Sequence, residues 1–176
     1  IYAAAHNLLC TLTSVSFMIP LAISNANAVK VGFANGAKNY TELKNYAYTT
    51  LGMSVFIMLF SALLIGVFPE FFISLFTTDK GLINICVPIL YVLCFYQIFD
   101  GLQVSFAGIF KGLKKTKIVM VSNFIAYRII SFPLGCLFAF HYHQNLIGFW
   151  FALCISAIII CAIMFVTMTK KFNNLS

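Results

Sequence analysis

Long apolar stretches alternate with short polar connections along the whole chain. Five of these stretches contain the 20 or so mostly apolar residues that a helix needs to cross the hydrocarbon core of a bilayer. Because the connections are short, we predict an all-α bundle of five transmembrane helices that forms a single domain over residues 1–176. The expected spans lie at about 5–28, 46–68, 82–110, 118–140 and 146–169.

Composition supports the same class of protein. Hydrophobic residues make up 62% of the chain, charged residues only 9%, and the mean hydropathy is +0.99. A soluble domain carries about 25% charged residues, so this composition excludes soluble, disordered, collagen-like and coiled-coil proteins. The six cysteines stand singly, without a CxxC pair or a histidine at ligand spacing, so we interpret them as packing residues. The many phenylalanines are expected to face lipid.

The lysines indicate which helix ends share a side of the membrane. Nine of the ten lysines fall in the first connection, the third connection and the C-terminal tail, whereas the second connection has Lys80 and the fourth only His141 and His143. Cytoplasmic loops are rich in Lys and Arg, so we expect a cytoplasmic C-terminus in the plasma (inner) membrane. The net charge of +7 therefore follows from topology and does not indicate a nucleic-acid partner. The first span would start outside without an upstream basic segment, so we expect at least one further helix before it.

Two charged residues fall inside the expected spans, Asp100 and Arg128. A charge near the middle of a membrane is costly, so each is a functional-site hypothesis. On a helix, Tyr96 and Gln103 share the face of Asp100, and Gln97 lies at its edge. This stripe could replace water around a small cation or hold a titratable proton. Two other interpretations stay open, a carboxylate paired with Arg128 for packing and a span that ends early and leaves Asp100 in water.

Further polar residues are candidates for lining a cavity. Arg128 lies about ten residues from either end of its span, which makes contact with the headgroups difficult. Pairing with Asp100 and contact with an anionic substrate explain its position equally well. Asn7 and Asn123 are also expected to line a cavity, whereas His6 is interpreted as a packing residue at the start of the first span.

Short runs distributed over nearly the whole chain carry a family resemblance. They are FMIPL at 17–21, VG at 31–32, GA at 36–37, FDGLQ at 99–103, AG at 107–108, KG at 111–112, Thr116, Tyr127, FPLG at 132–135 and GFW at 148–150. In their order and spacing, these runs resemble the later helices of the multidrug and toxic compound extrusion (MATE) transporters. No single motif is decisive.

The resemblance implies that the chain comprises helices eight to twelve of a twelve-helix, two-lobed transporter. Its partners would be the N-terminal lobe of the same protein and the surrounding membrane lipid. Such transporters are not enzymes and export cationic or amphipathic drugs in exchange for Na⁺ or H⁺, without an organic cofactor. In the sodium-coupled branch an acid on the tenth helix and a tyrosine one turn earlier belong to the cation site. Asp100 and Tyr96 match those positions, which makes Asp100 the expected Na⁺ ligand if Na⁺ couples. The chain departs from the family at Asn7, where glutamine is frequent, and at Arg128, where an aromatic residue is common.

Other functions stay open. A flippase for lipid-linked saccharides would need a cluster of intramembrane Arg and Lys, of which only Arg128 is present. A membrane-embedded enzyme would need a His or Cys constellation on a cavity-facing stripe, and the histidines lie at helix ends. An inactive truncated fragment is a third possibility. No nucleotide-binding loop occurs in the sequence, so an ion gradient is the expected source of energy.

Overall fold

The protein is a bundle of helices, described by a computed structural model over residues 2–138 and 145–174, and those ranges contain no strand. Five helical stretches within them are long and apolar enough to cross a membrane, which confirms the predicted number of spans. These stretches are Ala3–Gly36, Tyr40–Val67, Lys80–Gly112, Thr116–Cys136 and Ile147–Asn173.

The helices run beyond the predicted spans, most of all at the ends that carry lysines. The elements are α1 (Tyr2–Gly36), α2 (Tyr40–Val67), α3 (Pro69–Ser74), α4 (Lys80–Gly112), α5 (Thr116–Phe124), η1 (Ile125–Ser131), α6 (Phe132–Cys136) and α7 (Asn145–Asn173). Hydropathy identifies only the part of a helix that lies in the hydrocarbon core, whereas the helical backbone hydrogen bonds continue into the headgroup region. The predicted end of the fourth span at 140 and the histidines at 141 and 143 lie outside the described residues.

The fourth span changes its helical winding halfway along its length. Seven residues, Ile125–Ser131, form a π-helix between the α-helices α5 and α6. Pro133 lies in the first turn of α6. A proline has no N–H to donate, and in an α-helix its ring would clash with the carbonyl of Ile129, four residues earlier. The wider π-helical turn before Pro133 is a winding that avoids this clash.

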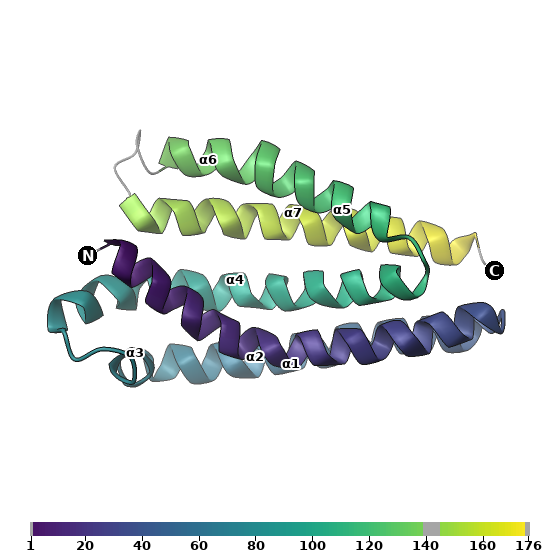
Figure 1. The fold of residues 1–176 in the computed structure, drawn as a ribbon, viewed down its shortest axis with the longest axis horizontal. Coiled ribbons are helices and arrows are strands. Elements are labelled where there is room, and N and C mark those ends of the chain that lie inside the picture. The colour runs from purple at the N-terminus through teal and green to yellow at the C-terminus, as the bar shows by residue number, and fades with distance from the viewer. Residues whose placement is uncertain (1, 139–144, 175–176) are drawn as a thin grey trace.

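Helix α4 lies in the middle of the bundle (Figure 1) and contacts α1, α2 and α7. α2 lies on one side of it, whereas α7 separates α4 from α6 on the other side. α1 runs beside α2 over its C-terminal half and crosses α4, so that its N-terminal end lies close to α7. Contacts between α1 and α4 are close because Gly108 and Gly112 face α1. The hydroxyl of Ser24 in α1 donates to the backbone carbonyl of Val104 at 2.7 Å, which joins the two helices directly.

Two apolar clusters form the core, one towards each end of the bundle. The first cluster includes Leu9 and Leu93, and the second includes Ile109 and Met164. Polar residues of α4 lie at the level between them, among them Gln97 and Gln103, and Ser105, which is hydrogen-bonded to Ser54 of α2. The bundle therefore carries a polar layer near its middle, where it would lie deepest in a bilayer. Large apolar side chains cover much of the outer surface, as suits contact with lipid, for example Phe33, Phe56 and Met120.

Candidate functional site

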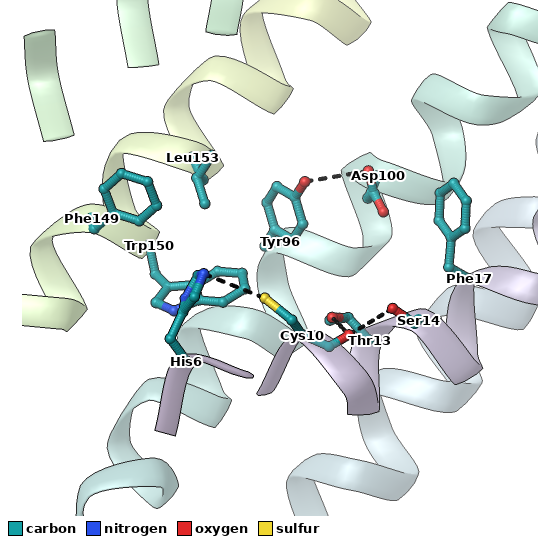
Figure 2. A pocket seen from close by; sticks show the side chains of 10 residues that line it. All are labelled: His6, Cys10, Thr13, Ser14, Phe17, Tyr96, Asp100, Phe149, Trp150 and Leu153. Atoms are coloured by element: carbon teal, nitrogen blue, oxygen red, sulfur yellow. Dashed lines mark hydrogen bonds between the residues drawn. The ribbon is translucent and has the colours of Figure 1, made fainter. Parts of the chain in front are cut away.

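A cavity of about 460 Å³ opens between α1, α4 and α7 near this polar layer. Figure 2 shows side chains from all three helices pointing into it. The three helices are far apart in sequence, so only the fold brings these side chains together. The lining residues are His6, Cys10, Thr13, Ser14 and Phe17 from α1, Tyr96 and Asp100 from α4, and Phe149, Trp150 and Leu153 from α7.

Asp100 supplies the negative charge of the cavity. Its carboxylate accepts a hydrogen bond from the phenol of Tyr96, one turn earlier, at 3.3 Å between Tyr96 Oη and Asp100 Oδ1. The other three acids of the chain lie at or near helix ends or in a short connecting helix, at Glu42, Glu70 and Asp79. Asp100 is therefore the acid placed deep within a spanning helix.

The length of α4 decides one question that the sequence left open. Tyr96 is the middle residue of α4, and the helix continues twelve residues past Asp100 to Gly112. At 1.5 Å per residue, Asp100 lies roughly 18 Å from that helix end. The span does not end early, and Asp100 is half-buried inside the bundle and not in an external loop.

Two hydroxyls of α1 add oxygen atoms to the cavity. Thr13 and Ser14 donate their protons to backbone carbonyls of the preceding turn at 2.7 to 2.9 Å. Because those protons are engaged, the lone pairs of the hydroxyl oxygens are the groups that can receive a ligand. Together with the Asp100 carboxylate and the Tyr96 phenol, they form a set of oxygen atoms of the kind that hard cations prefer. One carboxylate and neutral oxygens suit a monovalent cation or a proton.

The other wall of the cavity is aromatic. The ring of Trp150 lies 5.7 Å from the ring of His6 and 5.8 Å from that of Tyr96, between centroids, and Phe149 lies 6.2 Å from His6. Nδ1 of His6 and Nε1 of Trp150 are buried and have no hydrogen-bond partner among the residues described. Aromatic faces attract organic cations, and a buried nitrogen without a partner favours a ligand that can pair with it.

A second polar cluster lies beside the cavity, between α4 and the fourth span. Gln103 donates from Nε2 to Oδ1 of Asn123 at 3.2 Å and accepts at Oε1 from the phenol of Tyr127 at 2.9 Å. Tyr127 also interacts with the phenol of Tyr96. The two clusters are therefore continuous, and the π-helical segment η1 is connected through side chains to the carboxylate of Asp100.

The predicted site residues separate into groups in the structure. Asp100 and Tyr96 lie in the cavity, as their shared helix face indicated, whereas Gln103 and Asn123 meet each other in the neighbouring cluster. Gln97 is only 2% exposed and lies outside the cavity lining, and both of its side-chain polar atoms lack a partner within the described part of the chain.

Asn7 and Arg128 lie elsewhere. Both side chains are exposed on the surface of this five-helix bundle, and neither is among the residues that line the cavity. No ion pair joins Arg128 to Asp100 in residues 2–138 and 145–174, and Asp100 has Tyr96 as its hydrogen-bond partner instead. The structure therefore gives no support to the packing pair that was one interpretation of these two charges.

Much of the cavity wall was not predicted. Phe149 and Trp150 belong to an apolar run, and apolar periodicity does not distinguish a ring that faces a cavity from one that faces lipid. A signal was present in α1, where His6, Cys10, Thr13 and Phe17 recur at intervals of three or four residues. Such spacing places them on one helix face, and that face lines the cavity.

A family model and individual relatives point to the same family. The family model described as MatE matches residues 2–137. A probable multidrug resistance protein NorM of Mesorhizobium japonicum is 31% identical over 173 residues, which cover 96% of this chain and 37% of that protein. A second probable NorM, from Photorhabdus laumondii, is 30% identical over 172 residues, covering 96% and 38%. The chain thus spans about two fifths of the length of the curated relatives it matches.

Solved structures share the fold. A eukaryotic MATE transporter, AtDTX14, matches with a TM-score of 0.91 at 18% identity over 99% of this chain and 40% of that one. An outward-facing multidrug resistance MATE transporter of the MOP superfamily also gives 0.91, at 16% identity over 99% and 39%. An inward-facing one gives 0.87, at 14% identity over 98% and 40%. The match of the family model over more than half of the chain, together with this fold, shows that the chain belongs to the MatE family of multi-pass membrane transporters.

Proposed function

We propose that the chain forms the cation-coupling lobe of a secondary active multidrug efflux transporter. The observation that carries this proposal is the carboxylate of Asp100, held by Tyr96 in an oxygen-lined cavity in the middle of a membrane-spanning bundle. An ionisable group so placed serves an ion or substrate path more often than packing. The NorM relatives, named for multidrug resistance, give the substrate class.

A single carboxylate explains how two cations could be exchanged. The cavity contains one acid, Asp100, so it can neutralise one monovalent cation at a time. Na⁺ or H⁺ would bind the carboxylate with the phenol of Tyr96 and the hydroxyls of Thr13 and Ser14. A cationic drug would use the same carboxylate together with the aromatic wall at Trp150. Mutually exclusive binding of this kind lets the inward flow of one cation drive the outward movement of the other.

Exchange also requires the cavity to open to each side in turn. The fold of this chain matches an outward-facing and an inward-facing transporter almost equally well, with TM-scores of 0.91 and 0.87. This supports movement of the five helices largely as one body against a second lobe. Coupling would arise because an occupied and an empty Asp100 favour different arrangements, since a ligand shifts an equilibrium only through its differential affinity for the two states.

The lysine distribution gives the orientation that we propose within this scheme. The connection between α1 and α2, the connection after α4 and the C-terminal tail would lie in the cytoplasm, with the protein in the plasma (inner) membrane. A flippase for lipid-linked saccharides is less well supported, because such a substrate needs cationic groups in the cavity. Here the cavity carries the carboxylate of Asp100, and Arg128 lies outside its lining.

Efflux measurements on the full-length protein test this proposal. Asp100→Asn keeps size and hydrogen bonding but removes the titratable charge, so it should abolish ion-coupled export of ethidium at near-normal membrane expression. Tyr96→Phe should cause a smaller defect because it removes only the phenol oxygen. Glu70→Gln, which removes an exposed carboxylate in α3, is the matched control and should export normally.

Efflux is measured in cells that lack their own pumps, under an imposed Na⁺ or H⁺ gradient. Normal export by Asp100→Asn would show that the coupling site lies outside this lobe. Loss of the Asp100→Asn protein from the membrane, without loss of the Glu70→Gln protein, would point to a packing role for the carboxylate.

A further inference from the structure

A second groove, separate from the Asp100 cavity, lies between α1 and α2. It has a volume of about 240 Å³ and lies along the halves of these two helices that are nearer to their connection. None of its lining residues belongs to the Asp100 cavity, so the groove has no part in the cation exchange proposed above. The residues that decide its chemistry are Ile23, Asn27 and Lys30 from α1 and Tyr46, Thr49 and Met53 from α2.

Each polar residue of the groove can donate a hydrogen bond. The ammonium group of Lys30 lies 5.4 Å from the ring centroid of Tyr46, which holds this charge beside the groove. Asn27 is 4% exposed, and its Nδ2 has no hydrogen-bond partner among the described residues, although such buried donors are nearly always paired. Thr49 adds a hydroxyl, and no acidic side chain is among the lining residues. An ammonium, an amide N–H without a partner and a hydroxyl together suit an anion, and above all the oxygens of a phosphate.

The polarity of the groove changes along its length. α1 and α2 are antiparallel neighbours, so Lys30 faces Tyr46 near the connection and Ile23 faces Met53 towards the middle of the bundle. Lys30 is six residues from the end of α1 at Gly36, or roughly 9 Å along the axis. With the end of α1 at the outer edge of the headgroup region, that distance would place Lys30 near the boundary between headgroups and hydrocarbon.

We propose that this groove is a binding site for an anionic phospholipid. The phosphate would contact Lys30, Asn27 and the hydroxyl of Thr49, and an acyl chain would run past Ile23 and Met53, which is 49% exposed. A free phosphate would use only the polar end, and an uncharged lipid only the apolar end. A phospholipid matches both. The lysine-rich end of the bundle is the end expected in the cytoplasmic leaflet, whose surface is negatively charged.

Native mass spectrometry of the delipidated full-length protein in detergent tests the site. The probes are dioleoyl phosphatidylglycerol, inorganic phosphate and dioleoylglycerol, which separate the whole lipid from its anion and from its tails. Lys30→Gln should weaken phosphatidylglycerol binding about tenfold, because a charge-assisted contact is lost. Lys117→Gln removes the same charge from the exposed start of α5, outside the groove, and should change binding less than about twofold.

Further variants keep the test decisive if Lys30→Gln folds poorly. Lys30→Arg should retain binding, and Asn27→Leu should weaken it. Ala26→Phe should also weaken it, because it keeps the charge but fills the groove, which Ala26 lines. Equal losses in Lys30→Gln and Lys117→Gln would overturn the site in favour of non-specific charge attraction. Displacement of the lipid by equimolar inorganic phosphate, or equally tight binding of dioleoylglycerol, would overturn it as well.

Discussion

Replacing Gly108 by alanine should loosen the contact between α1 and α4. A Cβ atom added at this position would overlap the hydroxyl of Ser24 and lie 2.5 Å from the backbone oxygen of Ser24, where ordinary contacts are 3.4 to 4 Å. Two of the three atoms nearest to the added Cβ belong to the backbone of Ser24, which cannot rotate away. α1 would therefore have to move about 1 Å away from α4, and the hydrogen bond from Ser24 to the carbonyl of Val104 would be strained or lost.

The expected loss of stability is about 2 kcal/mol. Overpacking of this kind costs about 1–3 kcal/mol. An interhelical hydrogen bond in a membrane protein contributes about 0.6 kcal/mol. Alanine has a better helix propensity than glycine, which offsets the loss of stability by about 0.5–1 kcal/mol. A net change of about 2 kcal/mol shifts the unfolding equilibrium roughly 30-fold.

Equilibrium unfolding of the full-length protein by SDS in mixed micelles, followed by far-UV circular dichroism, measures this change. The matched control is Gly52→Ala on the exposed side of α2, where an added Cβ meets nothing within 4 Å. That variant should be as stable as the parent or slightly more stable. If Gly108→Ala unfolded at the same SDS fraction as Gly52→Ala, the close approach of α1 and α4 at Gly108 would be refuted.

Two further predictions concern the polar cluster and the topology. Tyr127→Phe should lower the free energy of unfolding by about 1 kcal/mol in the same assay, because Gln103 loses a donor, whereas Tyr91→Phe on the exposed surface should be close to neutral. Comparable losses in both variants would count against the cluster. In a cysteine-free background, an impermeant thiol reagent added to whole cells should label Lys80→Cys but not Lys115→Cys. The reverse pattern would invert the proposed orientation.

The sequence was a good guide to the helices because the bilayer imposes a simple requirement. Each span needs about 20 mostly apolar residues, and this requirement was enough to predict the five spanning helices. It could not reveal the π-helix at Ile125–Ser131, because the change of winding depends on how Pro133 and its neighbours pack and not on hydropathy. It also missed the short helix α3, which is too short to leave a periodic signal.

The candidate site could be predicted only in part for a related reason. Tyr96 and Asp100 were found because a charge and a phenol one turn apart in an apolar helix are conspicuous. Trp150 was not predicted as a cavity residue, since α7 is almost entirely apolar around it, from Leu146 to Ile155, and this run does not indicate which side faces α1. The same limit applies to Arg128, whose side chain could be placed only once the winding of the fourth span was known.

The most direct test of the central claim is the ion flux that accompanies substrate movement through the full-length protein in proteoliposomes. A gradient of a cationic substrate should drive a counterflow of Na⁺ or H⁺ through the parent protein. We predict that Asp100→Asn abolishes this counterflow, while Glu70→Gln retains it, because only the carboxylate of Asp100 lies in the cavity between α1, α4 and α7. An undiminished, substrate-driven ion flux through Asp100→Asn would contradict the account.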